Sequence, residues 1–174
     1  MSLNKTYLPS YAVSYGFTLI ELVVVIAVLA ILSALALPRF ADIADEAHRS
    51  SVEGTNGAYA AAVSLVRAQW LVNGNQTAVS NIRGFGDETV DVSSSGWPTG
   101  VNGNTNPNGM SVGECNDLWT KLLQTSAPSV SAAVGADYQT SVNGGDCRYT
   151  YQRDSTGNYI QYDPNNGEVT AVIN

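Results

Sequence analysis

An apolar segment near the start of the chain, Phe17 to Leu37, limits most strongly what the protein can fold into. Its polar residues are Thr18, Glu21 and Ser33. As an α-helix rising about 1.5 Å per residue, its 21 residues extend about 31 Å, the thickness of a bilayer's hydrocarbon core. The segment is longer than the apolar part of a secretory signal peptide. It predicts a helix that can span a membrane and that must lie in lipid or among copies of itself.

Glu21 is the residue that a simple membrane anchor does not explain. A carboxylate inside an apolar span is costly even on lenient insertion scales, so such residues usually have a partner or a function. In one interpretation Glu21 lies near the cytoplasmic interface and stays hydrated. In the other it has a functional partner. The segment begins abruptly, because residues 1–16 are mostly polar, carry one cation at Lys5 and end in Gly16.

The stretch GFTLIE, residues 16–21, resembles the processing site of type IV prepilins and their relatives. The apolar run after it, the proline at position 38 and an amphipathic stretch beyond agree with that family in order and spacing. The resemblance implies that residues 1–16 are a leader peptide and that a prepilin peptidase cuts between Gly16 and Phe17. It also implies that Phe17 is then N-methylated.

The same resemblance implies a role for Glu21 in assembly. In the family, the carboxylate of an incoming subunit attracts the free amine of Phe17 on a neighbour. This pair sets the axial register between apolar helices that would otherwise slide past one another. The implied partners are further copies of the chain, other pilins, the prepilin peptidase and the pilus assembly platform. The implied location is the bacterial inner membrane, crossed once, and after assembly an extracellular pilus.

An amphipathic helix is predicted after the apolar half. Pro38 removes a backbone donor and would kink or break the helix there. Apolar or small residues then recur at spacings of three and four as far as about Val72, and Asn73-Gly74 is a typical helix end. Gly54 and Gly57 each cost about 1 kcal/mol relative to alanine inside a helix. We therefore expect either a local bend or a close neighbouring helix at this point.

The remainder predicts a head with a C-terminal antiparallel sheet. Residues 75–113 are rich in glycine and turn signals, with β pieces possible at 89–92 and a short helix at 115–124. Alternating segments separated by turn sequences predict a β-meander. Its strands are 147–153, 159–163 and 168–173.

The expected fold class is α+β. In the family this is a pilin fold, in which the hydrophobic half of a long N-terminal helix protrudes and the other half packs on the sheet. The predicted parts are the leader 1–16, the hydrophobic transmembrane and filament-core half-helix 17–37, and a globular head 38–174 that includes the amphipathic half-helix 38–72.

One disulfide is the simplest interpretation of the two cysteines, Cys115 and Cys147. Neither lies in a CxxC or Cys/His cluster that would indicate zinc. Disulfides persist in oxidising spaces such as the periplasm and the cell exterior. In the family a disulfide near the C-terminus closes a surface loop, and a loop of this size would stabilise the fold by about 3–4 kcal/mol.

Catalysis, metal binding and nucleic-acid binding are not expected. A formal net charge of −7 without a Lys/Arg cluster argues against a nucleic-acid surface. His48 is the only histidine, and we interpret it as a solvated residue on the helix surface. Residues 163–168 could offer oxygen ligands to Ca²⁺, but their spacing is not that of an EF-hand, so a metal-free turn is favoured. No cofactor is implied, and the chain is not expected to be an enzyme.

The tyrosines of the strands are expected to pack against the helix, although an exposed Trp97 could contact sugars or surfaces. For function, the leading hypothesis is a structural subunit of a type IV pilus. Residues 38–74 resemble pilins of the mannose-sensitive haemagglutinin (MSHA) group, which implies adhesion and surface attachment. The alternatives are a type II secretion pseudopilin, a minor pilin or, more distantly, a membrane-anchored periplasmic enzyme or binding module.

Overall fold

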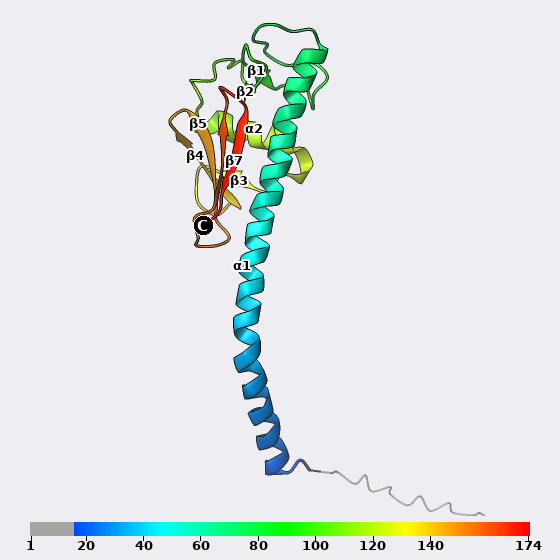
Figure 1. Ribbon diagram of the computed structural model, residues 1–174, viewed down its shortest axis with the longest axis vertical. Helices are drawn as coiled ribbons and strands as arrows, with labels where there is room; N and C mark the ends of the chain where they lie inside the picture. The colour runs from blue at the N-terminus through cyan, green and yellow to red at the C-terminus, as the bar shows by residue number, and fades with distance from the viewer. Residues whose placement is uncertain (1–15) are drawn as a thin grey trace, which may run out of the picture. The chain divides into compact units, whose positions relative to one another are not determined.

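The computed structural model describes residues 16–174, shown in Figure 1. The predicted leader, residues 1–16, lies outside the described residues apart from its last glycine. The chain divides into two compact units, one that ends at Asp42 and one from Ile43 to Asn174, which we call the head. The expected protrusion of the apolar half-helix concerns how these units are placed relative to each other, and it stays a prediction.

Helix α1 runs from Leu19 to Val72, so the long N-terminal helix is confirmed. The possibility that Pro38 breaks it is wrong, because α1 continues through this residue. Proline removes one hydrogen bond, to the carbonyl group four residues earlier, while the turns on either side keep theirs. The predicted kink at Pro38 stays a prediction.

The C-terminus of α1 shows why Asn73-Gly74 stops the helix. Gly74 has a positive φ of 70° and donates to the carbonyl of Leu71 at 3.0 Å. The amide of Asn75 donates to the carbonyl of Trp70 at 3.2 Å. These two bonds form a Schellman motif, which satisfies the last carbonyl groups of a helix. Because glycine adopts the left-handed conformation at little cost, this position ends α1 cleanly.

Five strands form the main sheet, in the order β3-β4-β5-β6-β7. Strands β4 to β7 pair antiparallel with their neighbours, and β3 pairs parallel with β4. Figure 1 shows labelled strands of this sheet beside the C-terminal half of α1. The strands are β3 (Val130–Ser131), β4 (Tyr138–Asn143), β5 (Asp146–Tyr151), β6 (Tyr159–Asp163) and β7 (Glu168–Val172).

The three strands predicted from alternation are therefore confirmed as β5, β6 and β7, with ends shifted by no more than two residues. The predicted sheet was too small, because β3 and β4 were missed. Strand β4 has the sequence YQTSVN, in which polar residues outnumber apolar ones. Its strand conformation depends on its antiparallel pairing with β5, a long-range contact that local periodicity does not report.

Helix α2 spans Val112–Leu123, and a 3₁₀ turn, η1, follows at Gln124–Ser126. The helix begins three residues before the predicted start at Cys115 because Ser111 and Glu114 form a capping box. The pattern Ser-x-x-Glu is the sequence signal for this start. A small two-stranded sheet pairs β1 (Asp91–Val92) with β2 (Pro98–Gly100). The first lies inside the predicted 89–92, whereas β2 falls where the sequence predicted a turn.

The core of the head lies between α1, α2 and the main sheet, and it is rich in aromatic rings. Tyr59 of α1 contacts Trp119 of α2 and Tyr149 of β5, each with ring centroids 5.5 Å apart. The hydroxyl of Tyr149 donates to the carbonyl of Cys115 at 2.8 Å and lies 3.1 Å from the hydroxyl of Tyr59. The prediction that strand tyrosines pack against the helix is confirmed. Cys115 is bonded to Cys147 as a disulfide between α2 and β5.

Candidate processing and assembly site

The residues around the predicted cleavage position lie before the first turn of α1. Gly16, Phe17 and Thr18 are outside the helix, and all three are exposed. The side chain of Phe17 is 85% exposed, and no described atom lies within 4 Å of the position that a Cβ at Gly16 would take. The peptide bond between Gly16 and Phe17 is therefore not held in helical hydrogen bonding, and neither flanking residue packs against the described part of the chain.

Thr18 and Glu21 form a capping box at the start of α1. The amide and the hydroxyl of Thr18 donate to Oε2 of Glu21 at 2.8 and 2.7 Å. The amide of Glu21 donates in return to Oγ1 of Thr18 at 3.3 Å. Two amide groups that the helix leaves without partners are thus satisfied reciprocally. Sequence reasoning identified Glu21 but not this partner, although Thr-x-x-Glu before an apolar run is a recognisable signal.

This capping box also orients the carboxylate. Because Glu21 bonds to Thr18, its charge is held towards the N-terminal end of α1, where the helix dipole favours a negative group. The amine that cleavage after Gly16 would create on Phe17 lies next to Thr18 in the chain. The anion therefore lies at the end of α1 that is nearest in the chain to the predicted cleavage position.

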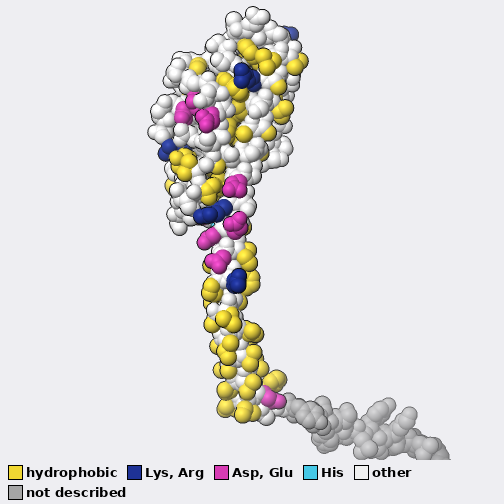
Figure 2. Space-filling view, viewed as in Figure 1, with side chains coloured by type: hydrophobic (Ala, Val, Ile, Leu, Met, Phe, Trp, Pro, Cys, Tyr) yellow, Lys and Arg dark blue, Asp and Glu magenta, His cyan; other side chains and the backbone are white. Residues whose placement is uncertain are grey.

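The segment after Glu21 keeps its apolar character around the helix. Residues from Leu19 to Leu37 include many large apolar side chains whose exposed fractions run from 46% to 81%. Figure 2 shows them as hydrophobic side chains on the viewed face of this part of the helix. Ser33 satisfies its hydroxyl inside the helix by donating to the carbonyl of Leu29 at 2.7 Å. By length and composition α1 contains one candidate membrane span, found among the described residues, and this span is unburied.

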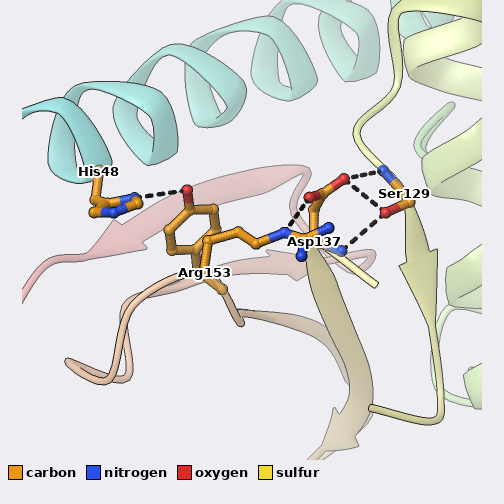
Figure 3. A network of polar contacts seen from close by, with 5 residues as sticks. His48, Ser129, Asp137 and Arg153 are labelled. Carbon is orange, nitrogen blue, oxygen red and sulfur yellow. Dashed lines mark hydrogen bonds and ion pairs between the residues drawn. The ribbon is translucent and has the colours of Figure 1, made fainter. Parts of the chain in front are cut away.

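His48 does not match the solvated residue that the sequence predicted. It is half-buried, and its Nδ1 lies 3.0 Å from the hydroxyl of Tyr151, so it joins α1 to the sheet (Figure 3). Close by, Asp137 accepts from the hydroxyl of Ser129 at 2.6 Å and from Nε of Arg153 at 2.6 Å. In a Ser-His-Asp relay the histidine bonds to both other residues. Here the carboxylate bonds to the serine and the arginine, and the histidine bonds to a tyrosine.

The predicted turn at residues 163–168 is closed by its own hydrogen bonds. The carboxylate of Asp163 accepts from the amide of Asn165 at 2.8 Å, and the amide of Gly167 donates to the carbonyl of Asp163 at 2.9 Å. The side chain of Asn166 accepts from the amide of Glu168 at 2.7 Å. Among residues 16–174, no group of three or more His, Cys, Asp or Glu side chains is placed to hold a metal ion.

Trp97 is not the exposed sugar-stacking ring that the sequence left open. The guanidinium of Arg67 lies 4.2 Å from its ring centroid. The ring also packs so closely on Gly167 that a Cβ at that position would collide with it. Trp97 is half-buried and connects α1 to the β6–β7 turn. Its position indicates a role in holding the head together.

Asp91 is a buried polar residue that sequence reasoning missed. Its side chain is fully buried, and its two oxygens accept from the amides of Asn81 at 2.9 Å and Gly103 at 2.6 Å. It therefore fixes two loops whose sequences contain no regular pattern. A buried carboxylate is tolerated when such donors satisfy it.

Comparison with known proteins supports the resemblance at the N-terminus. Residues 13–37 match the family model described as the prokaryotic N-terminal methylation motif. Over 54 residues the chain is 35% identical to the type IV narrow pilus major component PilA5 of Thermus thermophilus. This match covers 31% of the chain and 47% of the relative, so the chain spans about half the length of the curated relative it matches. No solved structure matches the chain.

Proposed function

We propose that this type IV pilin-like protein, which carries the N-terminal methylation motif, is a structural subunit of a type IV pilus. The observation that carries the proposal is that the matched motif, residues 13–37, contains the Gly16-Phe17 bond, Glu21 and the whole apolar segment. The α+β architecture with its long helix and sheet is that of a pilin. The chain is a substrate of processing and a building block, and we do not assign it a catalytic activity of its own.

Processing is the first step of the proposed function. A prepilin peptidase at the cytoplasmic face of the membrane cuts between Gly16 and Phe17, and Phe17 is then N-methylated. The exposed, non-helical backbone at these residues supports this step, because a peptidase binds substrate in a conformation that a helix does not offer. The candidate span then holds the mature chain in the inner membrane.

Assembly uses the charge of Glu21. The carboxylate of an incoming subunit pairs with the Phe17 amine of a neighbour in the filament. Each charge is costly alone in an apolar surrounding, whereas the pair is cheaper and fixes the register of helices that otherwise lack an axial preference. Two observations support this proposal. Thr18 donates hydrogen bonds to the Glu21 carboxylate, so the charge is partly satisfied before assembly. No cation among the described residues forms an ion pair with Glu21, so its charge is available to a neighbouring subunit. Thr18 thus stabilises the carboxylate while the subunit waits in the bilayer.

The finished filament places the apolar half-helices in its core and the heads on its outside. An outer wall of heads suits a chain whose head holds a disulfide and in which charged residues are only 13% of the sequence. We propose an MSHA-like pilus that serves adhesion and surface attachment. This finer assignment is supported by the resemblance of residues 38–74 and by the disulfide, which pseudopilins of type II secretion often lack.

Two measurements test the proposed function. The intact mass of the mature protein should equal that of residues 17–174 plus one methyl group. An uncleaved chain, or cleavage elsewhere, would remove the pilin assignment and favour a membrane-anchored module. Surface filaments sheared from cells should consist mainly of this chain. Filaments that contain it only as a trace would instead indicate a minor pilin, and a short periplasmic assembly would indicate a pseudopilin.

A further inference from the structure

The dipeptide Asn-Gly recurs along the chain, and it is the sequence in which asparagine loses its side-chain ammonia most readily. Glycine has no Cβ, so its backbone nitrogen can approach the side-chain amide of the preceding asparagine without a steric barrier. The reaction requires that this nitrogen and this amide are not held by other groups. The six asparagines that precede a glycine are Asn56, Asn73, Asn102, Asn108, Asn143 and Asn166.

Five of these sites hold the amide of their glycine in a hydrogen bond. Gly57 lies inside α1, where amides donate to the carbonyl group four residues earlier. The amides of Gly74, Gly109 and Gly167 donate to backbone carbonyls at 3.0, 3.3 and 2.9 Å. The amide of Gly103 donates to the buried carboxylate of Asp91 at 2.6 Å. Each of these bonds must break before the nitrogen can attack, so the fold protects these five sites.

The pair Asn143-Gly144 is not protected in this way. Asn143 ends β4, and the turn to β5 consists of Gly144 and Gly145, whose φ values of 65° and 101° are both positive. Neither the Gly144 amide nor the Asn143 side chain has a hydrogen-bond partner among residues 16–174. Both residues are exposed, and no described atom lies within 4 Å of the position that a Cβ at Gly144 would take. Water can therefore reach both reacting groups.

The position of Asn143 in the sheet also favours the reaction. Ring closure requires its backbone to leave the extended conformation of a strand. Asn143 lies opposite Asp146 in the last pair of the β4–β5 ladder, next to the turn. The ends of a structural element open at a lower free-energy cost than its interior. The required motion is therefore cheapest at this end of the hairpin.

We propose that Asn143 is the site in the head at which the folded protein deamidates. The Gly144 nitrogen loses its proton to water or hydroxide and forms a bond with Cγ of Asn143, whose side-chain nitrogen leaves as ammonia. Water then opens the resulting cyclic succinimide at either carbonyl, which yields aspartate or isoaspartate at this position. Nothing is oxidised or reduced, and water is the co-reactant. The inference does not depend on the proposed function.

Deamidation would change the β4–β5 hairpin. Either product places a carboxylate opposite Asp146, and like charges directly opposite each other destabilise an antiparallel pair. Isoaspartate also lengthens the backbone next to the turn. The carboxylate of Asp146 accepts from Nε2 of Gln161 on β6 at 2.6 Å, so the repulsion acts on a group that joins β5 to β6. This end of the sheet should become more acidic and less stable as the protein ages.

Peptide mapping of the intact chain over time tests the proposal. The protein in detergent is incubated at mildly alkaline pH, and mass spectrometry of its digests follows the conversion of each amide to a carboxyl group. We expect Asn143 to convert about fivefold or more faster than each of the other five asparagines, because their glycine amides must first break a hydrogen bond. Equal rates, or no conversion at Asn143, would overturn the inference.

The unfolded chain is the matched control for this measurement. In denaturant all six asparagines keep their glycine neighbour and lose the protection of the fold, so their rates should become similar. A preference for Asn143 that persists in denaturant would mean that local sequence sets it, and would contradict the structural argument.

A variant identifies the product. Enzymatic methylation of isoaspartate should give a strong signal in the aged parent protein. Asn143→Gln should lose most of this signal, because glutamine has to close a larger ring and reacts more slowly. An undiminished signal in the variant would place the reaction at another residue and refute the assignment.

Discussion

The carboxylate of Glu21 accepts hydrogen bonds from both the amide and the hydroxyl of Thr18, at 2.8 and 2.7 Å. We predict that Glu21→Ala leaves insertion into the membrane intact but abolishes filament assembly or N-methylation, because the partner of the Phe17 amine is lost. Membrane fractionation, intact mass and electron microscopy of surface filaments measure the three outcomes. Normal filaments from this variant would refute the pairing.

Glu21→Gln separates the charge from the cap. The amide oxygen of glutamine can still accept from Thr18, so the start of α1 stays capped. If the charge is what neighbours recognise, this variant should fail to assemble as completely as the alanine variant. Thr18→Val is the reverse change. It removes the capping hydroxyl, at a cost of about 0.5–2 kcal/mol to the helix start, and keeps the charge, so filaments should still form.

Gly167 should tolerate alanine poorly. Its φ is +78°, and an added Cβ would collide with the ring of Trp97. The left-handed backbone costs about 1–2 kcal/mol for a residue with a Cβ, and the collision adds about 1–3 kcal/mol. Gly157→Ala is the control, because Gly157 has nearly the same φ, +76°, with no described atom within 4 Å of its Cβ position. Thermal unfolding of the chain in detergent should show a clearly larger loss for Gly167→Ala.

The disulfide should contribute strongly to the stability of the head. It closes a loop between Cys115 and Cys147, with Cα atoms 5.5 Å apart, and both residues are fully buried. Replacing both cysteines with alanine should lower the free energy of unfolding by about 2–5 kcal/mol. A reducing agent added to the parent protein should destabilise it in the same direction and leave the double variant unchanged. A reductant effect of equal size on both proteins would contradict this assignment.

Tyr149→Phe should be more destabilising than the loss of one hydroxyl suggests. The Tyr149 hydroxyl donates to the Cys115 carbonyl and contacts the hydroxyl of Tyr59, and all three residues are fully buried. Its removal leaves buried polar groups unpaired, which costs about 1–3 kcal/mol. Tyr159→Phe provides the control, because Tyr159 is only half-buried. Denaturant unfolding in detergent should show a smaller effect for the control.

Asp137 should make the head sensitive to acid. Hydrogen bonds from Ser129 and then from Arg153 lower the pKa of Asp137 from 3.8 to about 2. A carboxylate with a depressed folded-state pKa stabilises the fold above its unfolded pKa and loses that contribution as the pH falls through the folded one. The stability difference between the parent and Asp137→Asn should therefore be complete above about pH 4 and shrink towards pH 2. Its size should stay below about 1 kcal/mol because the pair is partly exposed.

Asp45→Asn, on an exposed turn of α1, is the control for this titration. Unfolding free energies of the parent and both variants are compared between pH 2 and 7. A difference for Asp137→Asn that stays constant across this range would contradict the proposed linkage.

The parts of the fold that sequence predicted depend on local rules. The alternation of β5, the Asn73-Gly74 helix end and the apolar run before Pro38 each involve residues that are neighbours in the chain. The start of α2 was missed only because the Ser111 to Glu114 capping pattern was not applied. Strands β3 and β4 differ, because β3 is only two residues long and the sequence of β4 is too polar to indicate a strand until it pairs.

The residues of the candidate site likewise fall into those that local sequence identifies and those that only the folded chain brings together. The sequence alone identified Gly16, Phe17 and Glu21, because they occur in a specific order within the six residues 16–21. The contact of His48 with Tyr151 was not predictable, because 103 positions separate the two residues. Asp91 was missed for another reason: its partners, the amides of Asn81 and Gly103, are only 10 and 12 positions away, but they lie in loops whose conformation follows no regular sequence pattern.

The sequence by itself determined that a long helix with an apolar half must find lipid or other helices, and that one carboxylate lies near the start of that half. Composition and periodicity suffice for this, because an α-helix makes its backbone hydrogen bonds within itself, in lipid as well as in protein. Only the tertiary structure decided which distant parts of the head meet. The contact of His48 with Tyr151 and the packing of Trp97 on Gly167 join segments far apart in the chain, which long-range packing sets and local sequence does not encode.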